Sequence, residues 1–264
     1  MKMNILDKII IDKREEVASK KKLIPLSYLV KSPLLEREAL SLSQSILDGS
    51  GIITEFKRRS PSKQVINHRD GIIEVVRGYE NAGASGISVL TDTKYFGGSL
   101  DDLIQARDHL NIPLLRKEFI IDPYQIYEAK AFGADAILLI AAVLSPEEVT
   151  LFSQLAHQLD VEVLLEVHNE DELKRSDLDH VDLVGVNNRN LKTFEVSLET
   201  SKKLSSMIPD DKIKISESGI SSVESIMTLK QFGYKGFLIG ENFMKSDDPG
   251  KSAAEFIVAL GYEN

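Results

Sequence analysis

Short apolar runs recur along residues 51–240, and segments with helical periodicity separate them. Runs of four to eight mostly branched residues between Gly, Pro or polar clusters are typical of buried strands. The predicted strands are residues 51–57, 85–91, 113–117, 135–141, 162–167, 182–187, 212–217 and 236–240. Strands that alternate with helices form parallel sheets, and a flat parallel sheet this wide would be unusual. The pattern therefore predicts a closed (βα)8 TIM barrel of the α/β class.

Two further helical patterns precede the first strand, at about residues 4–20 and 33–47. We expect them to form an extra helical segment that packs over one mouth of the barrel. No low-complexity tract or Pro/Gly-rich linker interrupts the chain, and its 264 residues agree with the roughly 250 of a typical barrel. We predict a single domain, residues 1–264, in which residues 1–48 are an N-terminal helical extension.

Polar side chains end many of the apolar runs. These ends are Lys57, Lys117, His168, Asn188, Ser218 and Glu241. The carboxyl ends of barrel strands meet at one mouth, where active sites of this fold lie. Side chains two apart on a strand share a face, so Glu55 lies with Lys57 and Glu166 with His168. Either pair alone could be a rim salt bridge, but the same placement recurs around the ring. The further residues at equivalent heights are Lys117, Asn187 and Glu217.

Lys117 is the most informative single residue, because it follows the apolar segment 113–115 and Arg116 at a predicted strand end. A lysine among apolar neighbours and other cations can have a lowered pKa and act as a proton donor or a Schiff-base nucleophile. The alternative is a lysine whose ammonium simply reaches solvent from the strand end. Arg116 points the opposite way, and we expect it to face the helical layer.

Glycine-containing turns follow the last two predicted strands. They are Glu217-Ser218-Gly219 and Gly240-Glu241-Asn242. Either glycine alone could serve only as a turn. Loops at these two strands, with the amino end of a short helix, form the usual phosphate site of a barrel, because free backbone N–H groups favour an anion. We therefore predict phosphate binding here, and expect Gly219→Val to raise KM with little change in thermal stability.

Two phenylalanines and one arginine are further candidates for substrate binding. Phe96 and Phe119 could form an apolar slot for an aromatic ring, or could be ordinary packing. Arg189 could meet a carboxylate with two parallel hydrogen bonds, or could anchor its own loop. The five histidines lack the spacing of metal ligands, so no metal is assigned.

Composition and charge narrow the function. Hydrophobic residues make up 42% of the chain, enough for a sizeable core, and the formal net charge of −9 argues against a nucleic-acid partner. The absence of cysteine excludes disulfides, thiolate metal sites and cysteine nucleophiles. No apolar stretch is long enough to span a membrane, and the amino terminus carries charges where a signal peptide has an apolar core. We expect a cytoplasmic protein.

Several motifs, in order over most of the chain, resemble one enzyme family, indole-3-glycerol phosphate synthase of tryptophan biosynthesis. The matching segments are ITEFKRRSPSK (53–63), TDTKYFGGS (91–99), LLRKEFI (114–120), GADAILLIAA (133–142), LLEVH (164–168), GVNNRNL (185–191), SESGI (216–220) and FLIGENFM (237–244). The amino-terminal ILDKIIIDKREEV is similar to the extra helix of the family. The resemblance implies a (βα)8 barrel that closes the indole ring of 1-(2-carboxyphenylamino)-1-deoxyribulose 5-phosphate, with loss of CO₂ and water. It implies a carboxy-lyase without a cofactor whose partner is a phosphorylated small molecule.

The resemblance also implies roles for individual residues. Lys117 would be the general acid on the substrate carbonyl oxygen, and Glu166 the acid or base of the later dehydration. Lys57 would help to hold the anionic substrate, Glu55 would orient the lysines, and Asn187 would contact the reacting hydroxyl region. The division of the later proton transfers among Glu166, Glu55 and Lys57 stays open.

The resemblance places the substrate phosphate on Ser60 and on the backbone around Gly219 and Gly240. Two departures from the commoner family pattern affect the loops there. Gln64 stands where Gly often follows the SPSK motif, and Asn242-Phe243 replaces the usual small or Ser-Leu pair. We expect both departures to alter loop dynamics more than activity. The chain is expected to act as a monomer, and a partner enzyme of the same pathway remains open.

Other phosphate-binding barrels are the main alternatives. A phosphoribosylanthranilate isomerase would need a cysteine base, which the chain lacks. An isomerase that uses a pair of aspartates would need them on strands one and five, where Lys57 and Glu166 stand. A barrel that binds a phosphometabolite without catalysis is the alternative from a different class. Lys117 and Glu166 argue against it, and a comparison of product binding with turnover would distinguish the two.

Overall fold

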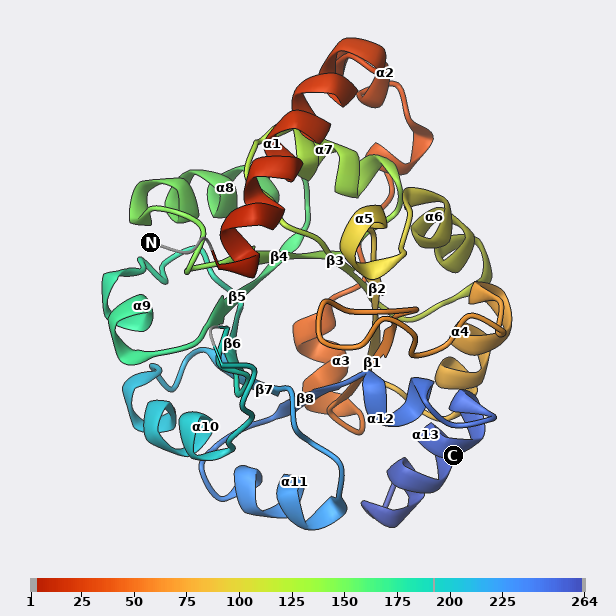
Figure 1. Ribbon diagram of the computed structural model, residues 1–264, viewed down its shortest axis with the longest axis vertical. Coiled ribbons are helices and arrows are strands. Elements are labelled where there is room, and N and C mark those ends of the chain that lie inside the picture. Colours follow the sequence, from red (N-terminus) through yellow and green to blue (C-terminus); the bar gives the residue numbers. More distant parts are fainter. Residues whose placement is uncertain (1–3, 192, 263–264) are drawn as a thin grey trace.

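Eight parallel strands close into one barrel in the order β1 to β8 (Figure 1). The computed structural model describes residues 4–191 and 193–262, so residues 1–3, 192 and 263–264 of the predicted domain lie outside the described residues. The strands are β1 Ile52–Phe56, β2 Gly86–Leu90, β3 Leu114–Lys117, β4 Ala136–Ile140, β5 Glu162–Val167, β6 Leu183–Asn187, β7 Ile213–Glu217 and β8 Gly236–Ile239. Each agrees with its prediction to within one residue at either end. The predicted (βα)8 barrel is confirmed.

A ring of helices surrounds the barrel. Its members are α4 Ile72–Asn81, α6 Leu100–His109, α7 Tyr124–Ala131, α8 Pro146–Gln158, α9 Glu170–Arg175, α10 Glu199–Leu204, η2 Ser205–Met207, α11 Val223–Lys230 and α13 Pro249–Ala259. Two short helices, α5 Thr93–Phe96 and α12 Glu241–Met244, follow β2 and β8 directly. Local sequence sets many of the starts. Helix α8, for example, begins with a capping box between Ser145 and Glu148, and Pro146 occupies its first turn.

The alternation of side chains along each strand divides the core in two. Outward-facing residues pack against the helices, while inward-facing residues fill the barrel interior. The inner cluster includes Ile53, Leu115, Leu164, Leu183, Ile215 and Leu238. The next inward position along these strands, two residues later, lies at the carboxyl mouth. The packing of the interior therefore fixes which polar side chains face into that mouth.

The N-terminal extension differs from its prediction. Residues 4–20 do form a helix, α1 Ile5–Leu23, but residues 33–47 are not one helix. They contain η1 Pro33–Leu35 and most of α3 Leu42–Asp48, and a short α2 Leu26–Leu29 precedes them. The helix is interrupted because carboxylates of the barrel accept two backbone N–H groups between η1 and α3, that of Ala39 at Asp160 and that of Leu40 at Asp135. Glu162 accepts the N–H of Ser43 in the first turn of α3.

The extension covers both ends of the barrel, and not one mouth as predicted. Helix α1 lies over the carboxyl mouth, where Ile5 lines the cavity described below. Helix α3 closes the opposite end, because Leu42 and Ile46 belong to the interior cluster. No helix in the described part of the chain is both long and apolar enough to cross a membrane.

Candidate active site

A cavity of about 400 Å³ opens at the carboxyl mouth of the barrel, beneath α1. All residues that the sequence singled out for catalysis or binding line it. They are Glu55, Lys57, Ser60, Phe96, Lys117, Phe119, Glu166, Asn187, Arg189, Glu217, Ser218, Gly219, Gly240 and Glu241. The structure thus brings together side chains from seven strand ends, while their chemical roles remain predictions.

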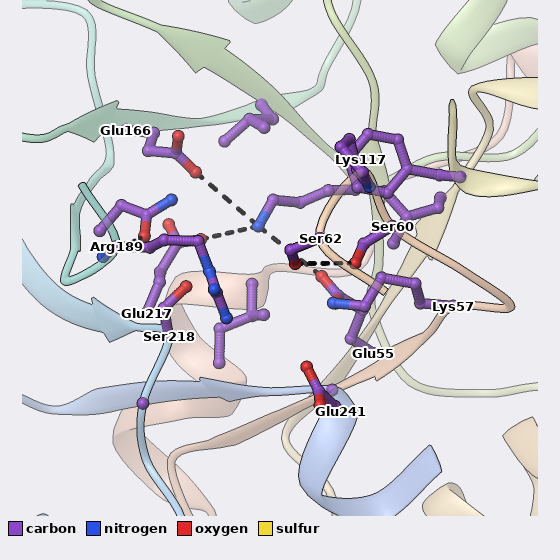
Figure 2. A pocket seen from close by; sticks show the side chains of 18 of the residues that line it. Glu55, Lys57, Ser60, Ser62, Lys117, Glu166, Arg189, Glu217, Ser218 and Glu241 are labelled. Atoms are coloured by element: carbon purple, nitrogen blue, oxygen red, sulfur yellow. Dashed lines mark hydrogen bonds and ion pairs between the residues drawn. The ribbon is translucent and has the colours of Figure 1, made fainter. Parts of the chain in front are cut away.

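The ammonium of Lys117 lies at the centre of this cavity and faces three carboxylates (Figure 2). Its Nζ lies 2.7 Å from Oε2 of Glu217, 3.7 Å from Oε2 of Glu55 and 3.9 Å from Oε2 of Glu166. The three acids come from β7, β1 and β5, so only the closed barrel can assemble them. Arg116 points away from the cavity, as expected, and pairs with Glu128 of α7.

The charge state of Lys117 corrects one expectation. Burial alone would lower its pKa, but the carboxylates of Glu217, Glu55 and Glu166 outweigh burial and raise the pKa above its usual value. Lys117 is therefore a stable ammonium at neutral pH and not a neutral amine. A permanent cation suits proton donation and the stabilisation of developing negative charge, and it argues against a Schiff-base nucleophile.

The pKa of Glu217 is raised as well, but for a carboxyl group this favours the neutral form. Burial raises its pKa to about 7, the nearby carboxylates of Glu166 and Glu55 act in the same direction, and Lys117 only partly offsets them. Its Oε1 is buried without a hydrogen-bond partner. Gly185 makes room for this side chain, since a Cβ at that position would lie 2.3 Å from Glu217 Oε1. Glu217 is thus a carboxyl group that can hold a proton near neutral pH beside Lys117.

His168 lies between two carboxylates, those of Glu166 and Glu172. His168 Nε2 lies 3.2 Å from Glu166 Oε1, and its Nδ1 lies 3.1 Å from Glu172 Oε2. Burial alone would lower the pKa of His168, but Glu166 and Glu172 raise it to about 10. Burial in turn would raise the pKa of Glu166, but His168 and Lys117 hold it well below its usual value. Glu166 is therefore a carboxylate at neutral pH, in the form that accepts a proton.

Glu55 of β1 and Lys57, which directly follows this strand, both line the cavity and form an ion pair there. Burial would raise the pKa of Glu55, but Lys57 and Lys117 outweigh it and lower the pKa. Ser88 also donates a hydrogen bond to Glu55. Glu55 therefore links the two lysines, an arrangement that agrees with an orienting role. Gly240 lies against it, since a Cβ there would approach Glu55 Oε1 to 2.4 Å.

The turn after β7 has two successive residues in the left-handed region, Ser218 with φ 67° and Gly219 with φ 76°. Successive N–H groups in such turns can form a concavity that binds anions. Asn188 holds the turn from behind, since its side chain donates to the backbone oxygens of Glu217 and Ser218. Asn188 ends an apolar run in the sequence, yet strand alternation turns it away from the cavity and leaves Asn187 to line it.

The geometry of Gly219 contradicts the expectation that Gly219→Val leaves stability unchanged. A Cβ at this position would lie 2.2 Å from Val196 Cγ1, and the positive φ disfavours a side chain. Ser60 lines the cavity from the loop after β1, and its hydroxyl lies 3.2 Å from that of Ser62. Glu241 forms an ion pair with Lys63 at 3.2 Å, which holds its carboxylate beside the turn after β8.

Apolar side chains form the other wall. The rings of Phe96 and Phe119 lie 5.9 Å apart between their centroids, and Leu138 and Ile140 of β4 line the same cavity. Helix α1 adds apolar residues that sequence reasoning did not assign to the site. They are Ile5, Leu6 and Ile9. Their spacing is that of one helical face, but the sequence does not indicate that this face covers a pocket.

Arg189 lines the cavity from the loop after β6. Its backbone N–H donates to Oδ1 of Asn187, and its backbone pairs with Val196 in an isolated bridge. These backbone contacts anchor the loop, and the guanidinium lies at the cavity (Figure 2). In the described part of the chain, no group of three His, Asp or Glu side chains could hold a metal ion.

Comparisons with known proteins show the family of the chain. The family model of indole-3-glycerol phosphate synthase matches residues 6–256. An indole-3-glycerol phosphate synthase of Bacteroides thetaiotaomicron is 45% identical over 258 residues, which cover 97% of this chain and 99% of the relative. An indole-3-glycerol phosphate synthase of a Polaromonas species is 43% identical over 257 residues, which cover 96% of this chain and 97% of the relative.

Solved structures give the same fold. Two mutant tryptophan synthase alpha-subunits of Pyrococcus furiosus superpose with TM-scores of 0.60 and 0.59 at 15% and 17% sequence identity. Each match covers 80% of this chain and 98% of the subunit. At this identity the likeness concerns the barrel alone. The family model, in contrast, matches nearly the whole chain, and two relatives are more than 40% identical over nearly their whole length. The chain therefore belongs to the indole-3-glycerol phosphate synthase family.

Proposed function

We propose that Lys117 and the carboxylates around it carry out the family's reaction in this cavity. That reaction closes the indole ring of 1-(2-carboxyphenylamino)-1-deoxyribulose 5-phosphate and releases CO₂ and water, a step of tryptophan biosynthesis. The observation that carries the assignment of residues is the buried ammonium of Lys117, within 4 Å of three carboxylates from three different strands.

Ring closure needs a cation at the substrate ketone. The ring carbon that bears the carboxylate attacks the carbonyl carbon, a C–C bond forms, and the carbonyl oxygen takes a proton. Lys117 is the proton donor, and its positive charge stabilises the negative charge that develops on that oxygen. Loss of CO₂ then returns its bonding electrons to the ring and restores aromaticity.

Dehydration needs a donor and an acceptor of protons. The new hydroxyl leaves as water after it receives a proton, and a proton leaves the neighbouring carbon as the double bond forms. Glu166 is the acceptor, because its lowered pKa keeps it ionised. Lys117 can return as the donor. Glu55 positions Lys117 and Lys57, and Asn187 contacts the reacting hydroxyl.

The two ends of the cavity suit the two ends of this substrate. The phosphate lies near Ser60 and the turns at Gly219 and Gly240. The anthranilate ring packs against the apolar wall that Phe96 and Phe119, whose rings contact each other, form with Leu138 and Ile140. Arg189 and Lys57 are cations of the cavity lining that can pair with the substrate carboxylate.

We also propose that the chain works as a monomer in the cytoplasm. Size-exclusion chromatography with light scattering tests the monomer directly. A dimer at micromolar concentration would contradict it. Fractionation of cells that produce the chain tests its location, and recovery with the membrane or secreted fraction would contradict that part.

Supplying the purified protein with the substrate tests the activity. Product formation is followed by the fluorescence of indole-3-glycerol phosphate, and CO₂ release is measured in the same sample. We expect equal amounts of the two products. Tight binding of the substrate without turnover would instead indicate a phosphometabolite-binding barrel.

A further inference from the structure

A second charged cluster lies beside the catalytic residues, beneath helix α1, and no step of the reaction uses it. Its centre is Lys13, which is only 2% exposed. The buried face of α1 consists of Ile9, Lys13 and Val17, each four residues from the next, so Lys13 occupies the middle of an otherwise apolar stripe. A lysine at such a position is costly unless its charge is paired, so its partners indicate what it does.

Three carboxylates surround this ammonium, and Glu16 also accepts a hydrogen bond from it. Lys13 Nζ lies 2.8 Å from Glu16 Oε2, 2.9 Å from Asp92 Oδ2 and 3.0 Å from Glu118 Oε1. Glu16 belongs to the same helix, but Asp92 and Glu118 follow β2 and β3. The last two side chains are 2% and 1% exposed. One buried cation thus joins α1 to two neighbouring strand ends.

Both barrel partners hold walls of the cavity. Asp92 caps α5, and its Oδ1 accepts the backbone N–H groups of Tyr95 and Phe96. Glu118 stands between Lys117 and Phe119, and its Oε1 accepts the backbone N–H of Phe119. The two carboxylates therefore fix the segments that carry both rings of the apolar wall.

We propose that Lys13 is a positioning residue that sets the distance between Phe96 and Phe119, and so determines how the aromatic half of the substrate is held. Without the cation, buried Asp92 would lose its ion pair, and Glu118 would keep only Arg116, 3.8 Å from its Oε2. The two carboxylates would move apart or take up water between them. Because each accepts the backbone N–H of one phenylalanine, Phe96 and Phe119 would move as well. This inference rests on the proposed binding of the anthranilate ring at the wall of Phe96 and Phe119, and it assigns to α1 a part in substrate binding beyond that of a cover.

The test compares Lys13→Met with Lys21→Met, in the full chain. Lys21 lies on the same helix and pairs with Asp122 at 2.8 Å, but its side chain is 47% exposed and the pair lies at the surface. We expect Lys13→Met to raise KM for the substrate by about tenfold or more, since small displacements of binding groups have effects of this order. The inhibition constant of inorganic phosphate, which probes only the other end of the cavity, should stay unchanged. Lys21→Met should leave both constants at the wild-type values.

The outcomes separate this inference from the proposed function. Absence of turnover in the wild-type protein would refute the function itself. Normal turnover in the wild type with an unchanged KM in Lys13→Met would overturn the inference alone. Equal weakening of substrate and phosphate binding would also overturn it, because that pattern indicates a general loosening of the barrel.

A second variant covers the case in which Lys13→Met does not fold. Glu118→Gln keeps the size of the side chain and an oxygen that can accept the Phe119 N–H, but removes one charge that Lys13 holds. We expect KM to rise in the same selective way, by a smaller factor. Folding is checked by circular dichroism at the assay temperature. An unchanged KM in a folded Glu118→Gln variant would overturn the proposal.

Discussion

Replacing Glu217 by Gln should make the protein's stability depend less on pH. The wild-type carboxyl has a pKa of about 7 in the folded protein, against the usual value of 4.5. The folded state therefore binds this proton more strongly than the unfolded state does. At pH below 4.5 the carboxyl is protonated in both states, so its ionisation does not lower the stability of the folded protein. As the pH rises from 4.5 to 7, the wild type loses stability, and above 7 the full penalty is present.

The size of the effect follows from the shift of the pKa. One pKa unit corresponds to about 1.4 kcal/mol, so the penalty approaches about 3 kcal/mol above pH 7 and is only partly present at pH 5. Glu217→Gln has no ionisable group here, so it escapes the penalty. The stability of the variant relative to the wild type should thus rise by about 2 to 3 kcal/mol from pH 5 to pH 8. The attraction between ionised Glu217 and Lys117 is already contained in the pKa of Glu217, so it adds no separate contribution to this difference.

Urea unfolding at pH 5 and pH 8, followed by circular dichroism, measures this quantity. Glu255→Gln is the control, because it removes a carboxylate from the exposed surface of α13. The control should change stability by less than about 0.5 kcal/mol at either pH. A pH-independent difference between Glu217→Gln and the wild type, or a difference that falls toward pH 8, would refute the assignment of a raised pKa to Glu217.

Two further predictions concern the roles of single residues. Glu166→Gln keeps the shape of the side chain but cannot accept a proton, so kcat should fall by about two to four powers of ten with a modest change in KM. Glu55→Gln should lower kcat by a smaller factor and shift the pH–rate profile. If Glu55→Gln instead lowers kcat more than Glu166→Gln does, the two residues have each other's roles. Gly219→Val should raise KM and also lower the melting temperature, because the new side chain meets Val196 and the backbone φ is positive. Calorimetry and steady-state kinetics check both effects, and an unchanged KM would place the phosphate elsewhere.

The strands could be predicted closely because a parallel barrel buries both faces of each strand, which makes every strand a continuous apolar run. The position of the candidate site could also be predicted from the sequence, since alternation alone places Glu55, Lys117 and Glu166 on inward faces near strand ends. The N-terminal extension could not. Residues 33–47 have helical periodicity, but backbone N–H groups there bind carboxylates of Asp135, Asp160 and Glu162, which are distant in sequence.

The pKa shifts and ion pairs of buried lysines could not be predicted from the sequence either. The sign of the pKa shift of Lys117 depends on acids from three other strands, and the sequence gives no distances between strand ends. The same holds for Lys13, whose partners lie about 80 and 105 residues away in the sequence. A lysine in an apolar stripe could have been noticed from the sequence, but its partners could not. The space around Gly219, which Val196 fills, is likewise a property of the packed loop.

The turnover of Lys117→Met tests the central claim most directly. The variant removes the ammonium and keeps a side chain of similar length. We expect kcat for indole-3-glycerol phosphate formation to fall by about 10²- to 10⁴-fold, the usual loss for a general acid, while the inhibition constant of inorganic phosphate stays near that of the wild type. Retention of more than about a tenth of the wild-type kcat would contradict the role of Lys117 as the proton donor.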